Sequence, residues 1–144
     1  MRFVARALVL IACLQASPTL ASGVSIVFFE YDSTRLVDPG GAILDNVEEQ
    51  VRVLQVPRLI IGAHADRAGS SSYNLQLSRR RAEAVRDELI RRGLSGVTID
   101  IEVFGENRPL VETADGVAEV QNRRADIMIV CIGNRDRALE YMRC

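Results

Sequence analysis

The stretch RLIIGAHADRAGSSSYNLQLSRRRAEAV, residues 58–85, decides the fold of this chain. It opens on an uninterrupted apolar run, which is typical of a β-strand covered on both faces. A polar loop follows, and Asn74 is placed to cap a helix that runs to Arg92 and stops at Gly93. One stripe of that helix carries Ser78, Ala82, Val85 and Leu89. We therefore predict a strand, a loop and an amphipathic helix.

The segment before this stretch predicts a second strand and helix. Residues 25–31 are rich in β-forming side chains and end in turn residues. Asp38 is placed to cap a helix with Pro39 at its first position, and this helix should end before Pro57. Its apolar stripe consists of Leu44, Val47, Val51 and Leu54.

The segment after residue 85 predicts two more strands. Apolar and polar residues alternate strictly over residues 97–103, as in a strand with one wet face. A polar loop with a turn of helix near residues 117–120 should lead to a last strand at residues 125–132. The predicted order is β-α-β-α-β-β, an α/β (α+β) two-layer sandwich with helices on one face of a mixed sheet.

The first 21 residues have the three regions of a secretory signal peptide, with cleavage near Ala21. We expect residues 22–133 to form one domain, residues 134–144 to form a tail with a short helix, and no transmembrane segment to remain after cleavage. A second reading stays open, because LIAC at residues 10–13 resembles a lipobox. In that reading Cys13 is lipidated and the protein is an outer-membrane lipoprotein.

Composition and cysteine count bound the partners and the redox state. The formal net charge of −1 gives no general attraction to nucleic acid. Export would place Cys131 and Cys144 in an oxidising compartment, where a disulfide could contribute up to about 3 kcal/mol. Two free thiols are the alternative.

Asp66 and Arg81 are the candidate binding residues. Asp66 follows the apolar strand, and Arg81 lies about 100° around the helix from the core-facing Ala82. A carboxylate and a guanidinium that face one groove without contact form a receptor for a zwitterion such as an α-amino-acid head group. If the two groups contact each other, they form a surface salt bridge worth at most about 1 kcal/mol. Their spacing alone leaves both readings open.

Residues 62–85, GAHADRAGSSSYNLQLSRRRAEAV, resemble the peptidoglycan-binding signature of OmpA-like domains. This module occurs in OmpA, in the peptidoglycan-associated lipoprotein and in the stator protein MotB. Similar segments at FFEYDSTRL, GENRPL and NRRADIMI extend the resemblance over residues 24–132. The ungapped match includes His64, Asp66, Gly69, Tyr73, Asn74, Leu77, Ser78, Arg81, Ala82 and Val85.

The resemblance implies non-covalent binding of peptidoglycan through the free amino-acid centre of meso-diaminopimelate in the stem peptide. In the family, the aspartate that matches Asp66 binds the ammonium group, and the arginine that matches Arg81 binds the carboxylate. The sequence reads FFEYDS where the family usually has a phenylalanine-aspartate run, so the resemblance leaves the register of the first motif open there. The resemblance also assigns secondary binding positions, which are Asn74, the backbone at Ala65, Asp32 and Arg123.

His64 is expected to support the loop that presents Asp66. We expect no metal site, because this His-x-Asp pair has no second histidine and no cysteine nearby in sequence. We also expect no cofactor and no enzymatic activity. A peptidoglycan hydrolase with Asp66 and His64 as its base pair would lack a suitable serine or cysteine nucleophile.

The prediction is therefore a binding module in the periplasm of a Gram-negative bacterium that anchors or organises the envelope on peptidoglycan. Envelope proteins are a further class of partner that such a module can have. The alternative is an OmpA-like domain that binds other proteins and no longer binds the wall.

Overall fold

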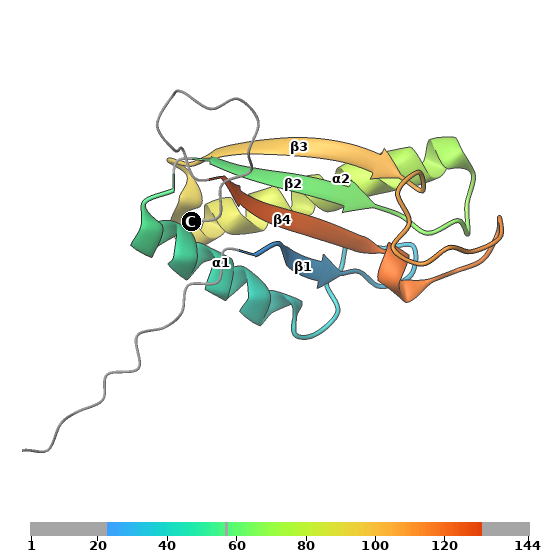
Figure 1. The fold of residues 1–144 in the computed structure, drawn as a ribbon, viewed down its shortest axis with the longest axis horizontal. Coiled ribbons are helices and arrows are strands. Elements are labelled where there is room, and N and C mark those ends of the chain that lie inside the picture. Colours follow the sequence, from blue (N-terminus) through green and yellow to red (C-terminus); the bar gives the residue numbers. More distant parts are fainter. Residues whose placement is uncertain (1–22, 57, 131–144) are drawn as a thin grey trace, which may run out of the picture.

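The computed structural model describes residues 23–56 and 58–130, which form one four-stranded sheet with two helices (Figure 1). The strands are β1 (Ser25–Phe28), β2 (Arg58–His64), β3 (Thr98–Gly105) and β4 (Arg124–Val130). The long helices are α1 (Gly40–Leu54) and α2 (Ser71–Leu89). Two short segments, η1 (Ile90–Leu94) and η2 (Val120–Asn122), follow α2 and precede β4.

The sheet is mixed, with strand order β1-β4-β2-β3. Strands β2 and β3 are parallel, and β4 is antiparallel to both of its neighbours, β1 and β2. The ends of β1 and β2 and the start of β4 therefore meet at one edge of the molecule, on the right in Figure 1. This edge carries the candidate site.

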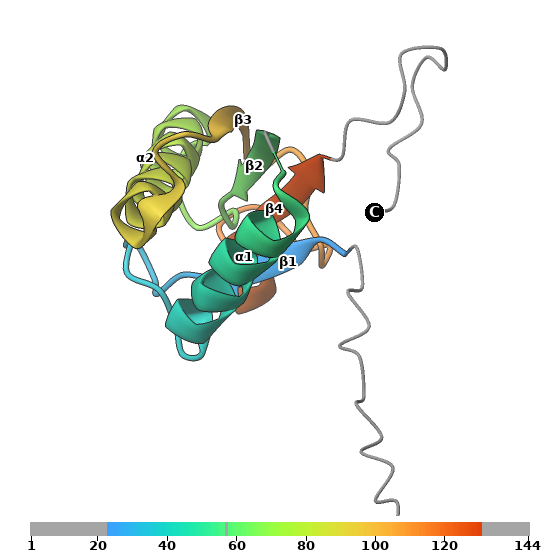
Figure 2. The same ribbon diagram turned by 90° about the vertical axis from the view of Figure 1, so that its left-hand side faces the viewer.

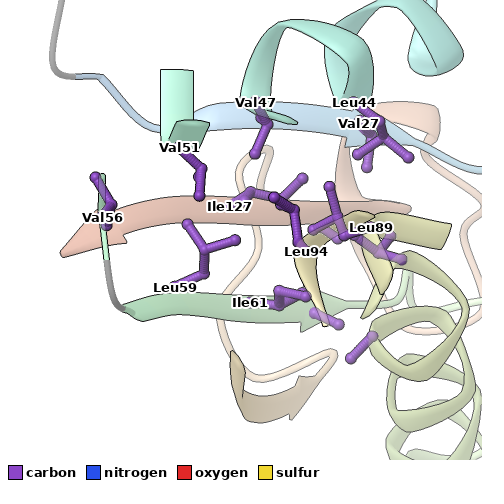
Figure 3. Packing of buried hydrophobic residues seen from close by; sticks show 14 of the residues in the cluster. Val27, Leu44, Val47, Val51, Val56, Leu59, Ile61, Leu89, Leu94 and Ile127 are labelled. Atoms are coloured by element: carbon purple, nitrogen blue, oxygen red, sulfur yellow. The ribbon is translucent and has the colours of Figure 1, made fainter. Parts of the chain in front are cut away.

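Both helices lie on one side of the sheet, as predicted (Figure 2). The core fills the space between the two layers (Figure 3). Alternate residues of the central strands face the helices, because successive side chains of a strand point to opposite faces. The predicted helical stripes are buried at Leu44, Val47 and Val51 in α1 and at Ser78, Ala82, Val85 and Leu89 in α2.

The helix starts differ from the sequence prediction. Ser70, not Asn74, caps α2, and its hydroxyl accepts a hydrogen bond from the backbone N–H of Tyr73. The Asn74 side chain is occupied elsewhere, because its amide donates to the carbonyl of Gly69 at 3.2 Å. Helix α1 starts at Gly40, after Pro39, and has no side-chain cap.

The remaining boundaries differ by a few residues. Regular pairing in β1 ends at Phe28, and Phe29 forms an isolated bridge to Leu36. The predicted helical turn near residues 117–120 is the 3-10 segment η2, which starts at Val120. The predicted end of the last strand and the tail at 134–144 lie outside the described residues.

Gly105 brings the end of β3 against the start of α2. Its φ of +57° lies in the left-handed region, and a Cβ there would stand 3.2 Å from the Cα of Leu75. The hydroxyl of Ser78 accepts the backbone N–H of Gly105 at 3.0 Å. This close contact fixes the helix that carries Asn74 and Arg81.

Candidate functional site

A cleft of about 100 Å³ opens between the residues after β1, the residues after β2 and the first turns of α2. Two carboxylates border it, one almost completely buried and one exposed. Its lining residues are Tyr31, Asp32, Asp66, Ala68, Gly69, Tyr73, Asn74 and Leu77.

Asp66 is the buried carboxylate, with 5% of its side chain exposed. Oxygen Oδ2 accepts hydrogen bonds from Nη1 of Arg123 at 3.1 Å and from the backbone N–H of Glu119 at 3.2 Å. Oxygen Oδ1 accepts only a long contact of 3.5 Å from the backbone N–H of Ala68 among the described residues. One oxygen is thus held by the protein, and the other keeps capacity to accept a hydrogen bond.

Arg81 is fully buried and is not among the residues that line the cleft. Nε donates to the carbonyl of Ser33 at 2.9 Å, Nη1 to that of His64 at 3.0 Å and Nη2 to that of Glu30 at 3.3 Å. Burial lowers the pKa of Arg81 to about 10, although the charge of Asp66 opposes the shift, so the guanidinium remains charged at neutral pH. Arg81 therefore joins α2 to the segment after β1 and to the end of β2.

Asp66 and Arg81 do not form an ion pair with each other. The ion-pair partner of Asp66 within residues 23–56 and 58–130 is Arg123, and the three hydrogen bonds of Arg81 go to backbone carbonyls. Of the two readings that the sequence left open, mutual pairing is therefore wrong. The two charges stand close enough for Asp66 to raise the pKa of Arg81.

The secondary positions surround this pair unevenly. Asn74 is buried and lines the cleft, and Asp32 is an exposed lining residue with a positive φ of 47°. Arg123 does not border the cleft, and its Nε donates to the carbonyl of Phe29 at 3.1 Å. The backbone N–H of Ala65 donates to the end of β3 at 2.8 Å.

Three further side chains shape the cleft, and no sequence pattern indicated a binding role for them. The Tyr73 hydroxyl donates to Asp32 across the cleft, and this bond raises the pKa of Tyr73. Tyr31 borders the cleft next to Asp32. Glu106 accepts a hydrogen bond from the Asn74 amide. The adjacency of each tyrosine to an assigned residue was the available sequence signal.

His64 is buried on the sheet face opposite the helices, because its neighbour Ala63 belongs to the core. Its ring stacks on Phe104, and Nε2 lies 3.2 Å from Asp126. Burial alone would raise the pKa of Asp126, but hydrogen bonding from His64 and the charge of Arg124 outweigh it and lower the pKa. The imidazole thus links β2 to β4, while the backbone carbonyl of His64 holds Arg81.

Several sequence predictions lie outside the described residues. These are the signal peptide, the lipidation of Cys13 and the disulfide between Cys131 and Cys144. Across the described ranges, no three His, Cys, Asp or Glu side chains gather in an arrangement that could hold a metal ion. None of the helices in those ranges has the length and apolar composition that a membrane span requires.

The sequence of this chain is similar to a known protein family and to several of its members. The OmpA family model matches residues 28–123. Outer membrane protein A of Bordetella avium is 32% identical over 103 residues, which cover 72% of this chain and 53% of that protein. The peptidoglycan-associated lipoprotein of Pseudomonas aeruginosa is 30% identical over 104 residues, 72% of this chain and 61% of the lipoprotein. The chain thus spans part of the length of each relative.

A solved structure matches the fold as well as the sequence. The crystal structure of the peptidoglycan-associated lipoprotein from Burkholderia pseudomallei superimposes with a TM-score of 0.65 and 31% identity. The match covers 72% of this chain and 88% of that one. It therefore includes most of the residues that the structure describes.

Proposed function

Because this chain belongs to the OmpA family, we propose that it binds peptidoglycan non-covalently and thereby anchors or organises the bacterial cell envelope. Similarity to lipoproteins named for their association with peptidoglycan supports the proposal. The proposed location is the periplasm of a Gram-negative bacterium. We propose a signal peptide at residues 1–21, the binding domain at residues 22–133 and a tail at residues 134–144. The alternative for the N-terminus is lipidation of Cys13, which would tether the protein to the outer membrane.

The buried carboxylate of Asp66 on the cleft wall is the observation that carries the proposal. A buried charge is costly unless it is paired, and Arg123 satisfies only one of the two carboxylate oxygens. The second oxygen, Asp32 and the buried amide of Asn74 gather around the same small space. We therefore propose that an ammonium group binds at Asp66, and that it belongs to the free amino-acid centre of diaminopimelate in the stem peptide.

Arg81 is the proposed partner of the ligand carboxylate. Its guanidinium has five N–H groups, and three of them donate to carbonyls. The longest of these bonds, 3.3 Å from Nη2 to Glu30, is the one that a carboxylate would most easily replace. Even without that exchange, the buried positive charge of Arg81 favours an anionic group nearby.

The proposed activity is recognition and not catalysis. Arg81 keeps its proton at neutral pH, so its guanidinium does not act as a general base. We propose instead that the carboxylate of Asp66 binds the ligand ammonium group and that the guanidinium of Arg81 binds the ligand carboxylate. We propose Asn74, the backbone at Ala65, Asp32 and Arg123 as groups that shape the site around them.

Co-sedimentation with purified sacculi of the diaminopimelate type tests the proposal. We expect the parent protein to sediment with sacculi, and free meso-diaminopimelate to release it. Asp66→Asn should lose at least tenfold in affinity, because the ammonium group loses its charged partner. Asp115→Asn, at an exposed aspartate, is the matched control and should bind like the parent. If the folded parent fails to sediment, the protein-binding alternative replaces this proposal.

A further inference from the structure

The size of the cleft limits what part of a ligand it can hold. Its volume is about 100 Å³, whereas sites for drug-sized ligands have about 300–1,000 Å³. It can accommodate one amino-acid head group and the first atoms of the attached chain. A sugar unit or several residues of a peptide would have to remain outside.

Two exposed tyrosines line the opening of the cleft. The part of the ligand that lies outside the cleft would have to pass between them. Tyr31 is 62% exposed and Tyr73 is 41% exposed, and both border the cleft. Tyr31 comes from the segment after β1, and Tyr73 comes from the first turn of α2. The cleft therefore has aromatic surface contributed by two different elements.

Each ring has contacts that restrict its position. The guanidinium of Arg123 lies 5.9 Å from the centre of the Tyr31 ring, and that of Arg80 lies 5.6 Å from the centre of the Tyr73 ring. The Tyr73 hydroxyl also donates to Asp32. Rings restricted in this way offer apolar contact area at a low entropic cost.

We propose that Tyr31 and Tyr73 form an aromatic collar that binds the unbranched aliphatic chain behind the ligand's head group. The inference rests on the proposed function, because it takes the amino-acid head group beside Asp66 as given. Diaminopimelate carries its second amino-acid centre at the end of such a chain. The collar adds selection by chain length and branching to selection by charge.

A series of free amino acids with one shared head group tests the collar. Glycine, alanine, 2-aminobutyrate, norvaline and norleucine, in both enantiomers where they exist, are titrated into isotope-labelled protein and followed by NMR. For the enantiomer that fits, we expect affinity to rise about fourfold for each methylene that enters the collar. Valine should bind more weakly than norvaline, because its branched chain is shorter along its length and extends less far toward the two rings.

Variants separate the collar from the head-group site. In Tyr31→Ala and in Tyr73→Ala the gain per methylene should fall below about twofold. The affinity of each variant for alanine is the reference for its own series, because Tyr73→Ala also removes the hydrogen bond to Asp32. Tyr31→Phe keeps the ring and should keep the gain. Val53→Ala is the matched control, because Val53 is 61% exposed on α1 and lies away from the cleft. Thermal unfolding verifies that each variant is folded.

The outcomes distinguish the collar from the proposed function. If alanine and norleucine bind the parent equally, the collar is wrong and the head-group site stands. If chain length matters equally in the parent and in both alanine variants, the aliphatic chain binds elsewhere and the collar is again wrong. If no amino acid binds and sacculi are not bound either, the proposed function fails and the collar fails with it.

Discussion

The guanidinium of Arg123 lies 3.1 Å from the carboxylate of Asp66, with only 13% and 5% of the two side chains exposed. The pair connects the residue that precedes β4 to the loop that follows β2, across 57 positions of sequence. It neutralises a buried carboxylate through one oxygen only. A ligand ammonium group would therefore add to this pair without having to displace it.

Replacement of Arg123 should reveal how much the pair stabilises the fold. Arg123→Gln leaves Asp66 buried without its cation, so we expect the free energy of unfolding to fall by about 3 kcal/mol in urea at neutral pH. Arg35→Gln removes an exposed pair with Glu30 and should cost at most about 1 kcal/mol. Equal losses in the two variants would contradict the burial argument. The double variant Asp66→Asn/Arg123→Gln should regain part of the loss.

Arg81 should be intolerant of substitution even by another cation. Lysine has no planar fork, so Arg81→Lys cannot reach the carbonyls of Glu30, Ser33 and His64 together. We expect a loss of about 2–4 kcal/mol in the free energy of unfolding, because one buried and two partly buried carbonyls lose their donors. Arg79→Lys, on the exposed side of α2, should change it by no more than about 0.5 kcal/mol. A stable Arg81→Lys protein would mean that these carbonyls find other donors.

The contact between α2 and β3 gives a third prediction. Ser78→Ala leaves the buried N–H of Gly105 without its acceptor at 3.0 Å, and should cost about 1–3 kcal/mol of stability. Ser95→Ala, at an exposed serine, is the control. Denaturant unfolding of both variants measures the difference. A Ser78→Ala protein as stable as the parent would indicate that the N–H finds another acceptor.

The periodic features of this fold could be predicted from the sequence, and the caps could not. Residues 44, 47 and 51 of α1 are spaced so that they share one face, whatever surrounds the helix. The start of α2 has three consecutive serines and then Asn74 four residues after Ser70, so several residues have the chemistry of a cap. Tertiary contacts decided between them, because Glu106 and the Gly69 carbonyl hold the Asn74 amide.

Some features of the candidate site could likewise be predicted from the sequence, and others could not. Asp66 follows a predicted strand, so its position at the end of the sheet could be predicted from local sequence. The surroundings of Arg81 could not, because its partners Glu30 and Ser33 are backbone carbonyls 51 and 48 positions away. Any residue supplies a carbonyl, so no side-chain pattern marks these positions. The pairing of Asp66 with Arg123 is equally non-local.

The network around His64 predicts a pH dependence at the acid end. The pKa of Asp126 is lowered in the folded state, so its contribution to stability is present above the ordinary value of about 3.8 and is lost as the pH falls through the lower folded value. The difference in unfolding free energy between the parent and Asp126→Asn should therefore shrink as the pH falls below about 4. Chemical denaturation between about pH 2.5 and 5, below the ordinary range of histidine titration, measures it. A constant difference would contradict the assignment.

Gly69 provides the most direct test of whether a ligand enters the cleft. A Cβ at this position would lie 2.9 Å from Oδ1 of Asn74 and 3.1 Å from Cδ1 of Tyr73, so Gly69→Ala must displace one of two lining side chains. We expect affinity for sacculi to fall by about fivefold or more, by analogy with the cost of overpacking. Gly96→Ala makes the same chemical change where no atom lies within 4 Å, and should bind like the parent. Neither glycine has a φ in the left-handed region, so backbone strain does not separate the two variants. If both glycine variants bound sacculi equally well, the ligand would have to bind outside this cleft.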